Sequence, residues 1–120
     1  MKSLKERRPG IRETETNALV LRLERNQKDV DRLRDRLGSY RCEPSTHGLF
    51  VRMESLRNGL EDLTRTNAEI IACLRKKKKF MDSYVESAER QFAEFNVLHG
   101  SIEEYVQGAM ANQRNLELIP

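Results

Sequence analysis

Residues 49–74 have the sequence LFVRMESLRNGLEDLTRTNAEIIACL, in which apolar side chains recur at alternating intervals of four and three residues. Such spacing places one side chain per turn on a single stripe of a helix, which is typical of a coiled-coil seam. The members of this seam are Leu49, Met53, Leu56, Leu60, Leu63, Asn67, Ile70 and Leu74. The stretch therefore predicts an all-α protein whose helices pack along narrow apolar stripes.

The same frame continues beyond residue 74. Its later members are Met81, Tyr84, Ala88, Phe95, Leu98, Ile102, Tyr105, Ala109 and Leu116. We therefore expect one long coiled-coil helix over residues 49–118. A kink is expected at Gly100, because a C-cap glycine followed by the capping box Ser101 to Glu104 would interrupt the helix. The aromatic members widen the stripe, which indicates that more than two helices meet there.

A shorter seam precedes the loop-forming residues. It consists of Leu19, Leu23, Asn26, Val30, Leu33 and Leu37. It predicts a first coiled-coil helix over residues 13–38, capped by the hydroxyl of Thr14 or Thr16. Residues 1–12 form a basic leader, expected to be flexible, and residues 39–48 form a Gly/Pro loop. The expected fold is thus two coiled-coil helices, a short N-terminal and a long C-terminal one, either as a hairpin or as an extended rod, assembling with partner helices.

The composition supports an interaction protein with a small core. Of the 120 residues, 34% are charged and 6% are aromatic, with no Trp, so we expect one domain that gains much of its order from partners. The net charge of +3 is unevenly distributed, because residues 1–79 carry +8 and residues 80–120 carry −5. Such asymmetry favours antiparallel or staggered contacts with partners.

Motifs for chemistry or membrane insertion are missing from the sequence. Cys42 and Cys73 are 31 residues apart and are expected to be reduced thiols in a cytosolic protein, while His47 and His99 are isolated. There is no Gly-rich phosphate loop and no fixed acid-base pair. The longest apolar run has five residues, against roughly 20 for a membrane span. We expect no enzyme, cofactor, metal or small-molecule substrate.

The seams supply the candidate partner-binding residues. These are Leu19, Leu23, Asn26, Val30, Leu33, Leu37, Met53, Leu56, Leu60, Leu63, Asn67, Ile70 and Leu74. A hairpin centred near residue 43 would place Asn26 opposite Leu60. Since a buried Asn is costly without a polar partner, we expect Asn26 and Asn67 to face polar groups on another chain, with an offset hairpin as the alternative.

The basic run Arg75, Lys76, Lys77, Lys78 and Lys79 is a candidate contact for anionic groups. Such runs serve as nuclear signals, phosphate-binding patches or contacts for anionic lipid. Five consecutive residues point around the whole helix, however, and few aromatic side chains accompany them. We therefore expect a solvated surface or a contact with an acidic partner, and not a nucleic-acid site.

Several segments together resemble one family. Arg8-Pro9-Gly10-Ile11, then Glu13-Thr14 and Leu23-Glu24, are similar to the start of the Muted-type subunit of the biogenesis of lysosome-related organelles complex. The Leu56, Leu60, Leu63, Asn67 spacing, the basic run and Ser87-Ala88-Glu89-Arg90-Gln91 resemble that family's longer helix. The resemblance covers residues 7–95. It implies a small cytosolic, membrane-peripheral protein that assembles with other short coiled-coil subunits in endosomal cargo sorting, without catalytic residues.

These observations favour a non-enzymatic coiled-coil subunit of a hetero-oligomeric complex in endosomal or lysosome-related organelle trafficking. We expect it to be cytoplasmic and peripheral on endosomal membranes. One alternative is a chromosome- or cytoskeleton-associated coiled-coil subunit. Another is a component of a SNARE-like helix bundle, against which the use of Asn as the polar seam residue counts.

Overall fold

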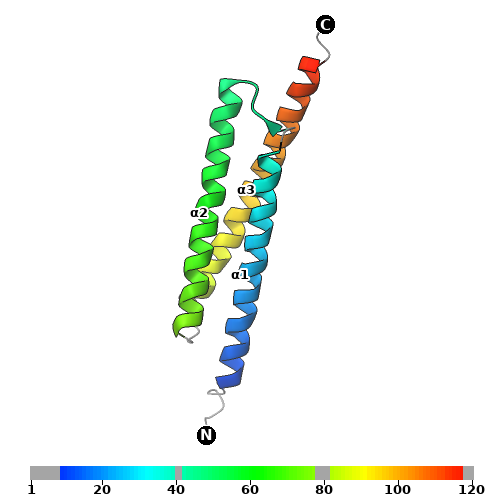
Figure 1. Ribbon diagram of the computed structural model, residues 1–120. Coiled ribbons are helices and arrows are strands. Elements are labelled where there is room, and N and C mark those ends of the chain that lie inside the picture. Colours follow the sequence, from blue (N-terminus) through cyan, green and yellow to red (C-terminus); the bar gives the residue numbers. More distant parts are fainter. Residues whose placement is uncertain (1–8, 40–41, 78–81, 118–120) are drawn as a thin grey trace.

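The computed structural model describes residues 9–39, 42–77 and 82–117, and within them the side chains of residues 14–39, 42–76 and 82–112. The described residues form three helices, α1 (Pro9–Leu37), α2 (His47–Lys77) and α3 (Asp82–Glu117), and contain no strand. The helices run up, down and up along one axis, as Figure 1 shows. The resulting bundle is elongated, with extents of 80 × 17 × 17 Å.

The expected all-α class is confirmed, but the expectation of one long second helix over residues 49–118 is wrong. Its two halves are the separate helices α2 and α3, which pack side by side in opposite directions (Figure 1). An unbroken seam fits a rod and a folded hairpin equally well. Folding back removes both halves of the seam from water, which supplies the driving force for the hairpin. Residues 78–81, between the two helices, lie outside the described part.

The helix does not end at Gly100, because α3 is continuous through this residue, and the kink expected there stays a prediction. Ile102, Tyr105 and Val106 directly after it are buried against the other helices. Tertiary packing of an apolar face generally outweighs the local preference of a single glycine. The local preference of Gly100 for a helix end is therefore outweighed by the burial of the following turn.

Helix α1 begins earlier than the expected start at residue 13. Pro9 lies in its first turn, where the missing N–H of proline has no intrahelical acceptor to lose. Thr14 and Thr16, expected as caps, consequently lie within the helix. Its end is close to the expected position, since the Gly38 amide still donates to the Arg34 carbonyl at 3.0 Å.

The expected Gly/Pro loop is present between α1 and α2. Thr46 ends this connection as the N-cap of α2, its Oγ1 accepting a hydrogen bond from the Leu49 amide at 3.1 Å. Cys42 in the same connection is buried and belongs to the core. The connection thus covers the end of the core beyond the last turn of α1, which is why α2 extends past α1 in Figure 1.

The core forms two clusters along the axis. The larger cluster lies toward the end of α1 and consists of Val30, Leu33, Leu37, Cys42, Met53, Leu56, Leu60, Leu63, Ile102, Tyr105, Val106 and Ala109. The smaller cluster lies toward the start of α1 and consists of Leu19, Val20, Leu23, Ile70, Ile71, Leu74 and Ala88. Each leucine buried in this way contributes roughly 1.5–3 kcal/mol. All three helices therefore share one apolar axis, interrupted at the level of Asn26 and Asn67.

Gly59 of α2 lies directly against the Leu98 side chain of α3. A Cβ atom at this position would lie 3.1 Å from Leu98 Cδ2, whereas Cβ atoms at Gly100 and Gly108 would have no neighbour within 4 Å. Glycine at position 59 therefore allows the two helices to approach, and glycine at the other two positions only adds flexibility to the unfolded chain.

Gly100→Ala and Gly108→Ala should each stabilise the protein by about 0.5–1 kcal/mol, because alanine favours the helix and meets open space. Urea denaturation followed by circular dichroism would measure the change. Gly59→Ala is the matched control and should gain less, since its methyl group presses on Leu98. Destabilisation by Gly100→Ala would show that α3 needs a flexible point at this residue.

Candidate partner-binding surface

The thirteen seam residues expected to bind a partner are all buried inside the bundle of this one chain. Those of α1 and α2 pack together in the two core clusters, and α3 covers them from the third side. In this fold they stabilise the chain itself and are not accessible to another protein. Any surface open to another protein therefore lies on the outer faces of the helices.

Asn26 and Asn67 contact each other, so the expectation that they face another chain is wrong and the offset hairpin is confirmed. The Asn67 Nδ2 group donates to Asn26 Oδ1 at 3.0 Å and to Gln27 Oε1 at 3.1 Å. Asn26 lies opposite Asn67, and not opposite Leu60, because the connection continues beyond the end of α1 before α2 begins. This displacement amounts to one heptad along α2.

Gln91 of α3 completes the polar layer formed by Asn26, Gln27 and Asn67. Its Nε2 donates to Asn67 Oδ1 at 2.9 Å and lies 3.4 Å from the Leu63 carbonyl oxygen. Asn67 is completely buried, so its amide depends on these partners in place of water. Gln91 occupies the seam position between Ala88 and Phe95, where the sequence has a polar residue, and it joins the third helix to the layer.

Charged side chains bridge two of the three outer grooves of the bundle. Between α1 and α3, Arg22 pairs with Glu89 at 3.3 Å, and Arg36 pairs with Glu103. Between α1 and α2, Arg75 pairs with Glu24. Some basic side chains from the first part of the chain therefore pair with acidic side chains from the last part within the bundle.

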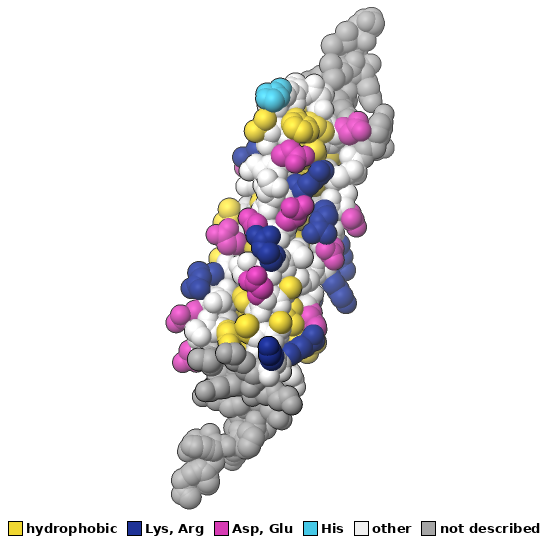
Figure 2. Space-filling view, turned by 60° about the vertical axis from the view of Figure 1, so that its left-hand side comes forward, with side chains coloured by type: hydrophobic (Ala, Val, Ile, Leu, Met, Phe, Trp, Pro, Cys, Tyr) yellow, Lys and Arg dark blue, Asp and Glu magenta, His cyan; other side chains and the backbone are white. Residues whose placement is uncertain are grey.

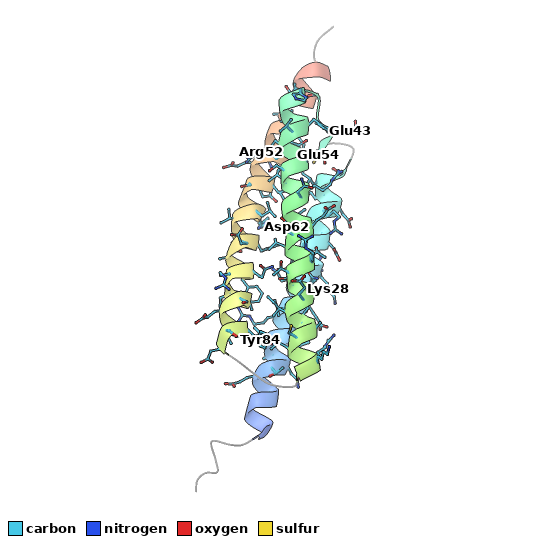
Figure 3. All side chains as sticks on the ribbon, turned by 90° about the vertical axis from the view of Figure 1, so that its left-hand side faces the viewer. Lys28, Glu43, Arg52, Glu54, Asp62 and Tyr84 are labelled. Atoms are coloured by element: carbon cyan, nitrogen blue, oxygen red, sulfur yellow. The ribbon has the colours of Figure 1, made fainter. Side chains whose placement is uncertain are left out.

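The groove between α2 and α3 is not bridged in this way. Among the described residues no ion pair joins these two helices, and their side-chain hydrogen bonds are those of Gln91. The groove has a volume of about 290 Å³ and contains Gly59 and Asp62 on one wall and Glu94 and Val97 on the other. Figure 3 views α2 with α3 on one side of it and α1 on the other. Sequence reasoning missed this groove because Gly59, Asp62, Glu94 and Val97 lie beside the seam.

The basic run is only partly described. Arg75 and Lys76 are exposed on the last turns of α2, and Arg75 is engaged with Glu24 of α1. The side chain of Lys77 and all of Lys78 and Lys79 lie outside the described residues. The expectation of a contact with anionic groups therefore stays a prediction.

Tyr105 joins α3 to the connection between the other two helices. Its hydroxyl donates to the Cys42 carbonyl oxygen at 2.9 Å inside the larger core cluster. Burial of the phenol, with a smaller electrostatic contribution from Cys42, raises the pKa of Tyr105 above its usual value. The neutral phenol is therefore the form that this contact needs.

The described residues contain no group of three or more side chains suited to hold a metal ion, and no helix among them is long and apolar enough to cross a membrane. Cys42 and Cys73 are both free thiols. No family model, no curated protein and no solved structure matches this chain. Its candidate surface is accordingly derived from the geometry of the bundle.

Asn67→Leu should destabilise the protein by about 1–3 kcal/mol, because it leaves the buried Asn26 Oδ1 without its donor and removes one acceptor of the half-buried Gln91. Urea denaturation would measure this, with the exposed Asn58→Leu as the control, for which we expect a change within about 0.5 kcal/mol. The double variant Asn26→Leu/Asn67→Leu should lose less than the sum of the single changes. Light scattering should then detect additional oligomeric states, since the layer no longer fixes the register. Equal stability of Asn67→Leu and the parent chain would contradict a structural role.

Tyr105→Phe should cost about 1 kcal/mol at neutral pH through loss of the hydrogen bond to Cys42. In the parent chain the unfolded state releases the phenolic proton first, since the pKa of Tyr105 is higher in the fold. Its contribution to stability is therefore complete below pH about 10 and declines as pH rises toward the folded pKa. Urea denaturation between pH 8 and 11 measures the free energy of unfolding. The decline caused by Tyr105 should be present in the parent chain and in Tyr84→Phe, and it should be missing in Tyr105→Phe. An identical alkaline decline in all three would contradict it.

Proposed function

We propose that this protein is a non-enzymatic helical subunit that assembles with other helical proteins into a hetero-oligomeric complex. The observation that carries the proposal is the apolar surface left uncovered by the three-helix bundle. Four large apolar side chains are about half exposed or more, namely Leu21 at 55%, Phe50 at 48%, Val51 at 52% and Val97 at 70%.

Isolated apolar side chains on a surface are common and need no explanation. Val97 differs because it adjoins the partly buried Leu98 and the open groove between α2 and α3. Figure 2 shows one face of the molecule, where apolar side chains lie among charges of both signs. An apolar strip with a charged border is the usual composition of a helix-binding surface.

Within this class, we propose a role in endosomal or lysosome-related organelle trafficking, as a cytoplasmic subunit peripheral to endosomal membranes. The resemblance of residues 7–95 to the Muted-type subunit supports this part of the proposal. An elongated bundle of antiparallel helices is also a form suited to assembly with other long helices along its sides.

The test is purification of the tagged chain from its own cell, followed by native mass spectrometry and identification of the associated chains. We expect stoichiometric helical partners. A variant with Leu21, Phe50, Val51 and Val97 changed to Ser should lose them, while its melting temperature changes by only a few degrees because these side chains are not in the core. A chain that purifies as a free monomer would contradict the proposal. Nuclear or microtubule-bound partners would contradict the trafficking role alone.

A further inference from the structure

The groove between α2 and α3 is the part of the surface whose geometry defines a partner most closely. Six of its residues matter here, namely Gly59, Asp62, Thr66, Glu94, Val97 and Leu98. Both walls are helices, so the groove runs along the axis of the bundle. A larger hollow of about 600 Å³ at Leu21 has described lining residues from α1 alone, and one of them, Glu24, is paired with Arg75.

The α3 wall of the groove has apolar side chains, and the α2 wall has small residues. Val97 is the most exposed of the large apolar side chains, and Leu98 beside it is only half-buried. On the α2 side, Gly59 has no side chain and Thr66 has a short one. Ridges of side chains on an approaching helix pack into grooves of this kind, at an interaxial distance of about 8–10 Å.

The border of the groove is acidic. Asp62 of α2 and Glu94 of α3 lie on opposite walls, and the described lining contains no Lys or Arg. Glu94 has no ion-pair partner among the described residues. Asp62 pairs with Arg65 one turn away, at 2.5 Å, but both side chains are more than 60% exposed. Such exposed pairs contribute little and are readily exchanged for another cation.

We propose that this groove binds a basic amphipathic helix of a partner protein and so completes a four-helix bundle. The inference rests on the proposed function and names the site and the chemistry of the partner. The apolar stripe of that helix packs on Val97 and Leu98, and Lys or Arg on its flanks pair with Asp62 and Glu94. A second copy of this chain in a two-fold arrangement is disfavoured, because it would place the acidic border against itself.

The experiment uses the full chain labelled with ¹⁵N and two synthetic 21-residue helical peptides. Both peptides have the same Leu seam, but one has Lys and Arg on its flanks and the other has Glu. Titration by heteronuclear NMR should show binding of the basic peptide with shifts at Gly59, Asp62, Thr66 and Val97. The acidic peptide should bind at least tenfold more weakly.

Two exposed positions provide matched variants. Val97→Glu should weaken binding of the basic peptide at least tenfold, whereas Val51→Glu, on the same kind of exposed site outside the groove, should not. Because both side chains are largely exposed, neither change should unfold the chain, and the NMR spectrum verifies this directly. Glu94→Lys should weaken the basic peptide and strengthen the acidic one, which a loss of folding would not do.

Three results would overturn the inference. They are equal affinity for the two peptides, shifts confined to another face such as Leu21 or Val51, and no binding of the basic peptide up to about 1 mM. None of these results affects the proposed function. A natural partner that purifies with the chain and depends on Leu21 or Phe50 would still support that function, although it would not bind in the groove. Association of two chains on the groove would show as a concentration-dependent mass and would overturn the choice of partner.

Discussion

The hydrogen bond between Asn67 and Asn26 is the interaction on which the arrangement of the bundle depends. Asn67 is completely buried, and its amide group is shared among Asn26, Gln27 and Gln91. A shift of any helix by one heptad would leave apolar layers in contact but would separate these amides. Apolar contacts therefore supply most of the stability, while the polar layer selects one register among several of similar apolar burial.

The same layer divides the core into two clusters with different surroundings. The larger cluster is closed at its end by the connection between α1 and α2, through Cys42 and its hydrogen bond from Tyr105. The smaller cluster relies on Tyr84, Val85 and Phe92 of α3, which are only partly buried. The first turns of α3 are thus the less protected part of the bundle, and local opening is expected to begin there.

The sequence predicted the helical class, the seams and the loop well, because these depend on local periodicity. Every seam residue from Leu19 to Leu37 and from Met53 to Leu74 is buried. The sequence did not predict what those residues pack against, because an apolar seam can pack equally well on a helix of the same chain or of another chain. The segment between α2 and α3 lacks a Gly or Pro signal, and the helix-end signal at Gly100 is outweighed by the packing of the next turn. The groove at Val97 was missed because it depends on which faces remain after three helices have packed.

The alternating directions of the three helices place the start of α1 and the end of α3 at opposite ends of the bundle (Figure 1). A pull applied between these two points acts along the helix axes. It would slide α1 past α3 as a whole, and the side-by-side pairs Arg22–Glu89 and Arg36–Glu103 would be loaded together. Sliding loads many contacts at once, whereas peeling breaks them one turn at a time. The topology therefore makes the bundle resistant to a pulling force along its length.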